Sequence, residues 1–179
     1  FNPCKMVYKN EIYDSVVFCC GSDQDEISYF KQVEIQHTKG QLLSINSFDM
    51  TEKETWNHKG FILPIGKKSF KVGATIERGV RDNKITKQGS DYLTGVLEGV
   101  FSGKYEVSTQ TSGIRPTVYD RRPVLGEHSE HKGLYIFNGL GTKGYLMAPL
   151  LAYEMMCFML SGKPLHKEVE LFRFYEKNQ

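Results

Sequence analysis

The chain has 179 residues, of which 40% are hydrophobic and 25% charged, and its formal net charge at pH 7 is +2. This length suffices for one well-formed core or two small domains. A near-neutral charge without a long basic run argues against a DNA-binding protein. No apolar stretch is expected to reach the length of a membrane span. The first residue is Phe1 rather than Met, so we expect either a fragment or a processed form of a longer protein.

The first half of the chain reads mainly as strands. Residues 14–21 are a short apolar run that ends in glycine, which is typical of a buried parallel strand. Residues 22–29 have room for one or two helical turns, and residues 33–45 form a second extended run that is broken at 39–41. Residues 60–65 and 69–76 predict a hairpin, because a Gly-Lys-Lys turn separates them.

Helical and extended segments alternate in the second half. Residues 86–101 predict an amphipathic helix that Thr86 caps. Residues 105–111 read as a strand, and residues 113–126 as a Pro- and Arg-rich crossing segment. A buried strand is predicted at 134–137.

A long helix closes the sequence pattern. It starts near Tyr145, has almost no polar face and is therefore predicted to be buried on most sides. Gly162 and Pro164 mark its end. Residues 166–179 form a charged tail in which Leu171, Phe172 and Phe174 are available for docking.

The four cysteines fit neither a metal site nor a disulfide framework. They are Cys4, Cys19, Cys20 and Cys157. Cys19 and Cys20 are neighbours on an expected strand, so their side chains face opposite sides. We expect free thiols in a reducing compartment, hence a cytoplasmic protein without a metal site, and we place Cys157 in the core.

The turn before the long helix is suited to binding a ligand. Gly139, Gly141 and Gly144 permit positive φ and a close approach of a ligand to the backbone. The helix that follows offers free N–H groups to a phosphate or to the electron-rich edge of a reduced flavin. The Gly-x-Gly-x-x-Gly spacing alone is a weak signal, because no acidic residue lies about twenty positions further on in a second strand to complete a dinucleotide fingerprint. A plain helix-entry turn is the alternative.

Arg115 is the main candidate for binding a carboxylate. It lies between Ile114 and Pro116, in a segment expected to be rigid and partly buried. Its planar guanidinium can hold a carboxylate through two hydrogen bonds. The alternative is an internal salt bridge, for instance with Asp120.

Three further features have plainer interpretations. Residues 127–131 contain two histidines among carboxylates, but their order does not match a known metal motif, so a solvated turn is the stronger interpretation. Trp56 is expected in a core. His37 could border a substrate cavity. A partly buried histidine whose ring nitrogens are hydrogen-bonded within the protein is the simpler interpretation.

Four segments, taken in their order along the chain, match the pattern of one known family. They are residues 16–21 (VVFCCG), residues 39–43 (KGQLL), residues 71–77 (KVGATIE), and residues 113–126 followed by the glycine turn and Ala148-Pro149. Together they resemble the C-terminal half of the D-amino-acid oxidase and glycine oxidase superfamily of FAD-dependent amine oxidoreductases. The resemblance covers nearly the whole chain, and its order is more specific than any single motif.

This resemblance implies an α+β (mixed) fold. An antiparallel-rich substrate-binding sheet with helices is inserted between strands of an FAD-binding domain whose N-terminal Rossmann part is absent from the chain. The implied divisions are residues 1–32 (end of the FAD-binding domain), 33–112 (substrate-binding domain), 113–165 (flavin-contacting segment) and 166–179 (charged tail). FAD is expected to bind non-covalently and mainly through the missing half, since Gly113 stands where some members carry a flavin-linking cysteine.

The resemblance also implies roles for single residues. Arg115 is expected to clamp the substrate carboxylate, and Gln41 to contact the substrate. Lys71 falls where some members place a catalytic lysine that assists the reaction with oxygen, with a solvated strand lysine as the alternative. The implied cofactor contacts are Gly113, Ile114, Arg115, Gly139, Leu140, Gly141, Thr142, Lys143, Gly144 and Tyr145.

Two functions remain open at this point. The resemblance implies a fragment of an FAD-dependent oxidoreductase that oxidises the C–N bond of an amino acid or secondary amine by hydride transfer, with the isolated chain inactive. Its partner is then a small amine or amino acid, and self-association through an exposed domain interface is also expected. The competing hypothesis is a stand-alone, non-catalytic α+β domain that binds a small carboxylate or a protein partner.

Overall fold

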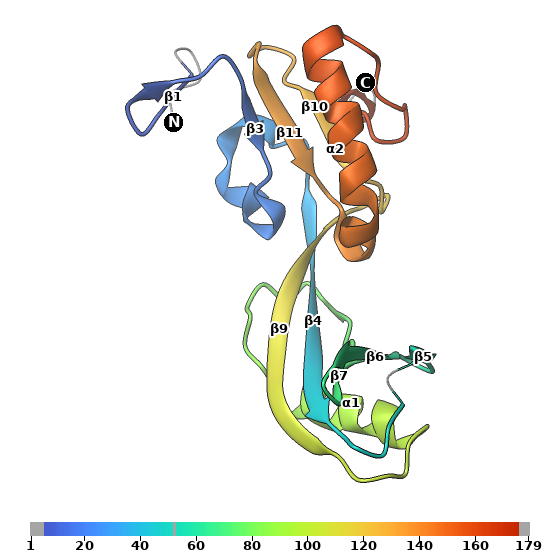
Figure 1. The fold of residues 1–179 in the computed structure, drawn as a ribbon. Helices are drawn as coiled ribbons and strands as arrows, with labels where there is room; N and C mark the ends of the chain where they lie inside the picture. Colours follow the sequence, from blue (N-terminus) through green and yellow to red (C-terminus); the bar gives the residue numbers. More distant parts are fainter. Residues whose placement is uncertain (1–5, 52, 176–179) are drawn as a thin grey trace. The chain divides into compact units, whose positions relative to one another are not determined.

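The computed structural model of this protein describes residues 6–51 and 53–175. The chain divides into two compact units (Figure 1): unit 1 comprises Phe1–Gln36 and Arg115–Gln179, and unit 2 comprises His37–Ile114. The chain therefore begins in unit 1, builds unit 2 and returns to unit 1, in the order expected of an insertion. The divisions predicted at residues 33 and 113 lie close to these changes of unit.

Unit 1 is built on a three-stranded sheet with the order β10-β11-β3. β10 (Val124–Glu127) runs antiparallel to β11 (Leu134–Asn138), and β11 runs parallel to β3 (Val16–Phe18). The parallel pair thus joins a strand before the insertion to one after it. β3 is shorter than the predicted strand at 14–21. A separate hairpin of β1 (Val7–Tyr8) and β2 (Glu11–Ile12) precedes it.

Both faces of this sheet are covered, because successive side chains of a strand point to opposite sides. α2 (Gly144–Ser161) packs on one face through a cluster that includes Leu125 and Tyr135. On the other face Leu134 and Ile136 pack into a second cluster. That cluster draws on the 3₁₀ helices η2 (Ser28–Phe30) and η4 (Leu171–Phe174), and η1 (Gly21–Glu26) precedes η2. Of the tail residues predicted to dock, Leu171 and Phe174 are buried and Phe172 is exposed.

α2 lies where the sequence predicts it, but the prediction that it is buried on most sides is wrong. Gly162, with a φ of 67°, ends the helix in the left-handed conformation. Only Leu151 and Met155 are buried among its described residues, and Cys157, expected in the core, is partly exposed. Just one side of the helix therefore meets the sheet.

The helical segment Gly141–Ser161 also corrects the expectation that no stretch reaches the length of a membrane span. It combines α2 with the 3₁₀ turn η3 (Gly141–Lys143), is 21 residues long and has a mean hydropathy of 1.3. By length and composition alone it could cross a membrane. A single helix of this kind is weak evidence for a span, since helices of soluble proteins meet the same criterion.

Unit 2 is a six-stranded sheet with the helix α1 (Lys87–Glu98) on one face. The strand order is β5-β6-β7-β4-β8, and β9 also pairs with β4. As predicted, Thr86 caps α1, with its Oγ1 accepting a hydrogen bond of 3.0 Å from the Gly89 N–H. The strand bounds are Ile35–Asn46 for β4, Trp56–Asn57 for β5, Phe61–Gly66 for β6, Ser69–Gly73 for β7, Glu77–Arg78 for β8 and Glu106–Val118 for β9.

Two of these strands are longer than predicted. β4 is not broken at residues 39–41, because β8 pairs with Thr38 and Lys39, β7 pairs with the following part of the strand, and β9 pairs with it as well. β9 continues through Pro116 to Val118, in the region predicted as a crossing segment. Neighbouring strands therefore override the local preference of glycine and proline for turns. Trp56 packs partly buried against the core of unit 2, in accord with its predicted place.

Candidate functional site

The glycine turn of unit 1 has the backbone geometry that its sequence predicts. Gly139 and Gly141 have φ values of 73° and 55°, in the region that favours glycine. A Cβ at Gly139 would lie 2.4 Å from Cγ2 of Val118, so the end of β9 packs directly on the turn. Gly144, in contrast, is helical, and its Cβ would lie 3.0 Å from that of Leu140.

The helical segment after the turn presents its first N–H groups without side-chain caps. Neither Leu140 nor Lys143, the residues that precede η3 and α2 in the described chain, makes a side-chain hydrogen bond to them. Thr142, Lys143 and Tyr145 are exposed beside these groups. Unpaired N–H groups at the positive end of a helix are suited to an anionic or electron-rich ligand. The turn therefore offers an exposed, glycine-lined surface to a ligand of this kind.

Arg115 lies on a strand that contacts this turn. Thr117 forms a β-bridge with Leu140, and a Cβ at Gly141 would lie 3.6 Å from Oγ1 of Thr117. Arg115 precedes Thr117 by two residues on β9 and is half-buried, and this burial lowers the pKa of its guanidinium. The guanidinium nevertheless stays protonated at any physiological pH. Unit 1 thus brings together the predicted carboxylate clamp and the predicted flavin turn.

Asp120, the predicted salt-bridge partner in the alternative interpretation of Arg115, pairs with another residue. Its Oδ2 lies 2.9 Å from Nε of Arg173, in an ion pair whose side chains are 19% and 14% exposed. Its Oδ1 accepts a hydrogen bond from the backbone N–H of Arg122. The structure therefore assigns the stabilising salt bridge of this segment to Arg173, a residue of the tail that the sequence left without a role.

Lys71 and Gln41 lie on opposite faces of the sheet in unit 2. Lys71 pairs with Ser44 across β7 and β4, and its Nζ donates a hydrogen bond of 2.6 Å to Ser44 Oγ. Leu43 lies in the core that packs against α1, so Ser44 and Lys71 point to the other face. Gln41 shares the face of Leu43, and a Cβ at Gly89 of α1 would lie 2.5 Å from its Nε2. One ligand on this sheet cannot contact both side chains.

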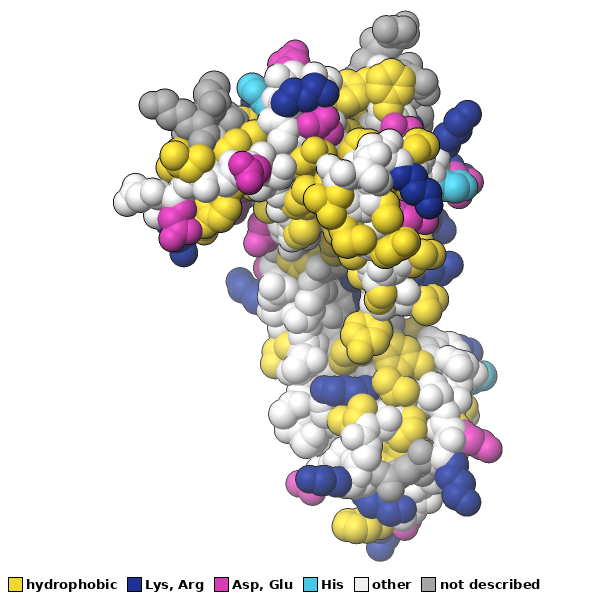
Figure 2. Space-filling view, turned by 45° about the horizontal axis from the view of Figure 1, so that its top comes forward, with side chains coloured by type: hydrophobic (Ala, Val, Ile, Leu, Met, Phe, Trp, Pro, Cys, Tyr) yellow, Lys and Arg dark blue, Asp and Glu magenta, His cyan; other side chains and the backbone are white. Residues whose placement is uncertain are grey.

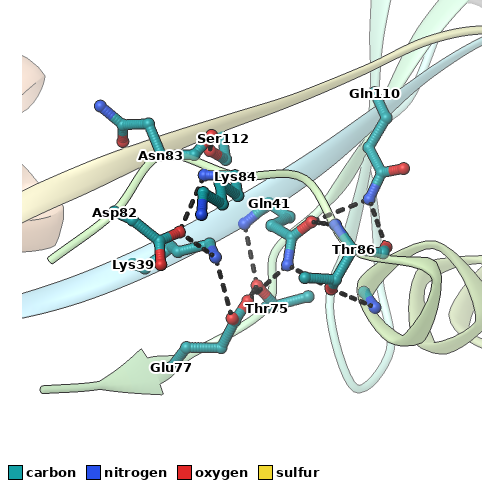
Figure 3. Close-up of polar contacts among 11 residues, drawn as sticks. Lys39, Gln41, Thr75, Glu77, Asp82, Asn83, Lys84, Thr86, Gln110 and Ser112 are labelled. Atoms are coloured by element: carbon teal, nitrogen blue, oxygen red, sulfur yellow. Dashed lines mark hydrogen bonds and ion pairs between the residues drawn. The ribbon is translucent and has the colours of Figure 1, made fainter. Parts of the chain in front are cut away.

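The Gln41 side chain is fully engaged in a buried hydrogen-bond network (Figure 3). Its Nε2 donates to Glu77 Oε1 at 2.7 Å and to Thr86 Oγ1 at 3.0 Å. Its Oε1 accepts from the backbone N–H of Thr86 at 2.9 Å and from Nε2 of Gln110 at 2.8 Å. Both amide protons and both oxygen lone pairs are therefore used within unit 2. The geometry gives Gln41 a structural role, and its contact with substrate stays a prediction.

A buried lysine completes this network. Lys39 is 2% exposed, and its Nζ lies 3.5 Å from Glu77 Oε2 and 3.2 Å from Asp82 Oδ1. The hydrogen bond from Gln41 is the main cause of a lowered pKa at Glu77, and Thr75 and Lys39 lower it further against the opposing effect of burial. The network fixes the segment between β8 and α1 against β4. Sequence reasoning missed Lys39 and Glu77, although both lie within the motifs that carry the family resemblance.

The turn predicted at residues 127–131 is exposed at Ser129 and Glu130, but His128 does not belong to its solvated surface. His128 is buried, and its Nε2 lies 2.7 Å from the Tyr29 carbonyl oxygen. Its Nδ1 accepts from the backbone N–H groups of Glu130 and His131. Both ring nitrogens are used in fixing the β10–β11 connection, and no cluster of three potential metal ligands occurs among the described residues. His37, in unit 2, is 8% exposed.

A cavity of about 470 Å³ lies at the far end of α2, away from the glycine turn. Glu154 and the 163–167 segment line it. One carboxylate oxygen of Glu154 is buried without a hydrogen-bond partner in the described chain. Glu154 follows Gly144 by ten residues, which corresponds to about 15 Å along a helix. The cavity is therefore separate from the candidate site.

Comparison with known proteins identifies the family. The family described as FAD dependent oxidoreductase (DAO) matches residues 6–156, a range that includes β3, all of unit 2 and the glycine turn. The chain belongs to this family. Among DAO relatives, the MnmC protein of Thiobacillus denitrificans, named for tRNA 5-methylaminomethyl-2-thiouridine biosynthesis, is 28% identical over 89% of this chain and 28% of its own length. A glycine oxidase of Bacillus licheniformis is 27% identical over 83% of this chain and 42% of its own length.

Solved DAO-type structures share the fold. The iminodiacetate oxidase of Chelativorans sp. BNC1 superposes with a TM-score of 0.78 at 23% identity, over 92% of this chain and 46% of that chain. The glycine oxidase of Bacillus cereus gives 0.73 at 23% identity, over 84% and 43%. The fold class is thus mixed α/β with antiparallel sheets, as in these flavoenzymes. The chain spans less than half the length of each of these relatives.

Proposed function

We propose that this chain is the substrate- and flavin-contacting part of an oxidoreductase that oxidises the C–N bond of an amino acid or secondary amine. The observation that carries the proposal is the bridge between Thr117 and Leu140, which holds the strand of Arg115 against an uncapped glycine turn. An arginine beside an N–H-rich turn offers one group for a substrate carboxylate and another for an electron-rich cofactor edge. Membership of the DAO family supports this combination.

Bound FAD supplies the hydride acceptor in such a reaction. The residues of this chain would hold it non-covalently: the backbone N–H groups from Gly139 to Tyr145 would bind its electron-rich edge, and Gly113 has no sulfur for a covalent link. The remaining FAD contacts are proposed to come from a Rossmann part outside these 179 residues, since each relative compared above is more than twice as long as the portion that matches. In that arrangement the isolated chain is inactive and colourless.

Arg115 is proposed to bind and orient the substrate carboxylate. Its guanidinium is half-buried, and partial removal of solvent strengthens a charge-assisted hydrogen bond. Lys71, whose Nζ is fixed by Ser44, is proposed as the lysine that assists the reaction with oxygen. Because the amine can lose its proton before it reacts, no side chain of the chain has to act as a general base.

The names of two relatives narrow the substrate class. Glycine and iminodiacetate both contain an amine nitrogen attached to a CH₂ group that carries a carboxylate. We propose a substrate with this N–CH₂–COO⁻ unit, bound by its carboxylate at Arg115. The free thiols of the described cysteines accord with a reducing, cytoplasmic location, which is likewise a proposal.

The test is a pair of Arg115 variants in the flavin-loaded protein. Arg115→Leu removes two charge-assisted hydrogen bonds, each worth about 1.5–3 kcal/mol, so kcat/KM for glycine or iminodiacetate should fall about 100-fold or more. Arg115→Lys should recover only part of this loss, because an ammonium cannot form the planar pair. Flavin absorbance and melting temperature should stay near those of the parent, as in the control Arg122→Leu.

Two results would contradict the proposal. Unchanged kcat/KM in Arg115→Leu would remove Arg115 from the substrate site. A full-length protein that binds no flavin and oxidises neither amine, yet binds a small carboxylate through Arg115, would instead favour the non-catalytic binding domain.

A further inference from the structure

The cavity at the far end of α2, which we call the α2 cavity, lies between the helix and the segment that follows it. Its volume of about 470 Å³ is in the range of small-molecule sites. Figure 2 shows the hydrophobic face of unit 1 that carries α2, with basic side chains and a histidine at its edge. The cavity is lined by Glu154, Lys163, Pro164, Leu165, His166 and Lys167. None of these residues belongs to the candidate site at the glycine turn.

The core of unit 1 fixes the walls of the α2 cavity. Leu165 and Val169 are 5% and 6% exposed, and they pack in the same hydrophobic cluster as Leu151 of α2. The backbone N–H groups of Val169 and Glu170 both donate to the carbonyl oxygen of His166, at 2.9 and 3.2 Å. Binding sites of small molecules are usually formed in advance in this way. The cavity is therefore part of the fold and does not depend on a ligand to shape it.

Glu154 provides an acceptor that the fold leaves unsatisfied. Its Oε2 is buried and has no hydrogen-bond partner among the described residues. Buried polar atoms are normally hydrogen-bonded, and an unsatisfied charged group destabilises a protein more than a neutral one does. The wall of the cavity that α2 contributes is therefore suited to a cationic donor.

The segment after α2 provides the opposite charge. Neither Lys163 nor Lys167 takes part in an ion pair within the described part of the chain. The neighbouring carboxylate of Glu168 pairs instead with Arg122, at 3.4 Å. The Nδ1 of His166 accepts a hydrogen bond of 3.3 Å from the backbone N–H of Glu168, so the proton of a neutral ring lies on Nε2. This wall therefore offers only donors and positive charge to an anionic group.

A ligand that carries both charges matches both walls. A metal ion needs several ligands, and no cluster of three potential metal ligands occurs among the described residues. An ammonium group is suited to Glu154 and a carboxylate to the lysine side, while Pro164 and Leu165 offer apolar surface. We propose that the α2 cavity is a second ligand site, which binds a free amino acid with an apolar side chain as its zwitterion. This site is separate from the carboxylate clamp proposed at Arg115.

An internal ion pair is the alternative use of these groups. Lys163 or Lys167 would then reach Glu154 and close the cavity without a ligand. In the structure neither lysine pairs with Glu154, and the cavity is open. The two arrangements differ in stability: Glu154→Gln destabilises a protein that holds the internal pair, whereas it leaves the melting temperature unchanged or raises it when the carboxylate has no partner.

The test is calorimetric titration of leucine into the full-length protein and into its Arg115→Leu variant, which lacks the proposed clamp. We expect saturable binding in both, with a dissociation constant of about 1 mM or lower. Adding Glu154→Gln keeps the shape of the side chain but removes its charge, so binding should weaken by about 10-fold or more. Glu106→Gln is the matched control, because Glu106 is exposed in unit 2 and should leave the binding unchanged.

Two truncated ligands examine the two walls separately. 3-Methylbutylamine is leucine without its carboxylate, and 4-methylpentanoate is leucine without its amine. Each should bind about 10-fold or more weakly than leucine, since each loses one charge-assisted contact. Replacing Lys163 and Lys167 together by alanine should weaken the binding of leucine and leave that of 3-methylbutylamine unchanged. If either truncated ligand binds as tightly as leucine, the zwitterion site is overturned.

Three further results would overturn the proposal. The first is that leucine does not bind, or binds equally well after Glu154→Gln. The second is that Arg115→Leu alone abolishes the binding, because the ligand then occupies the proposed substrate site. The third is that Glu154→Gln lowers the melting temperature of the ligand-free protein, as the internal ion pair predicts. A protein that holds no flavin but binds leucine through Glu154 contradicts the proposed function and supports the second site.

Discussion

Removing Arg173 should destabilise unit 1 more than removing any exposed arginine. Its guanidinium forms the ion pair with Asp120 and also donates to three backbone carbonyl groups, of Glu170, Arg122 and Pro123, at 2.9–3.1 Å. These bonds tie η4 to the turn between β9 and β10. In Arg173→Ala, the mostly buried side chain of Asp120 loses its cationic partner.

The magnitude follows from that uncompensated carboxylate. Breaking a buried pair by removing one partner costs about 3–5 kcal/mol, and the 14–19% exposure of these side chains moves the expected value to about 3 kcal/mol. For a chain of this size, each kcal/mol lowers the melting temperature by roughly 2–4 °C. We therefore expect a decrease of about 6–12 °C.

The assay is urea denaturation with a matched variant, Arg122→Ala. Arg122 forms an exposed pair with Glu168 at 3.4 Å, with side chains 52% and 58% exposed, and such pairs contribute about 0–1 kcal/mol. Asp120→Asn and the double variant complete a cycle that isolates the pairwise energy. If Arg173→Ala loses no more free energy of unfolding than Arg122→Ala does, the assignment of the structural salt bridge to Arg173 is refuted.

Two further predictions concern the networks and turns of the fold. The hydrogen bond from Gln41 is the largest cause of the lowered pKa of Glu77. The contribution of Glu77 to stability is therefore present above the ordinary glutamate pKa of 4.5 and is lost as the pH falls below that value. Glu77→Gln should therefore weaken the acid dependence of the free energy of unfolding, measured by denaturation across that range, and an unchanged acid limb would contradict this. Gly139→Ala should cost about 2 kcal/mol or more, because its φ is 73° and the new Cβ would lie 2.4 Å from Val118. Gly95→Ala in α1, where nothing lies within 4 Å, should instead stabilise by about 0.5–1 kcal/mol, and equal effects of the two substitutions on the midpoint would refute the steric argument.

The candidate site shows where pattern reasoning succeeds. The glycine turn and the start and end of α2 could be predicted because they depend on local conformational preferences, such as positive φ at Gly139, Gly141 and Gly162. The Thr86 cap is local for the same reason: its partner is three residues away. Arg115 could be named from its neighbours, although its role as a clamp is still a prediction.

The sequence by itself determined the two long helices, the glycine turn before α2, the hairpin of β6 and β7 and the family to which the chain belongs. Only the tertiary structure decided which long-range partners are used. It pairs Asp120 with Arg173, 53 residues away, and it places Gln41 against α1 while Lys71 faces the other side of the same sheet. It also leaves one side of α2 exposed. The apolar composition of α2 indicates that the helix must be covered, but it does not indicate which part of the polypeptide covers it. Hydrogen bonds and packing between distant segments depend on strand register and docking, which no local propensity specifies.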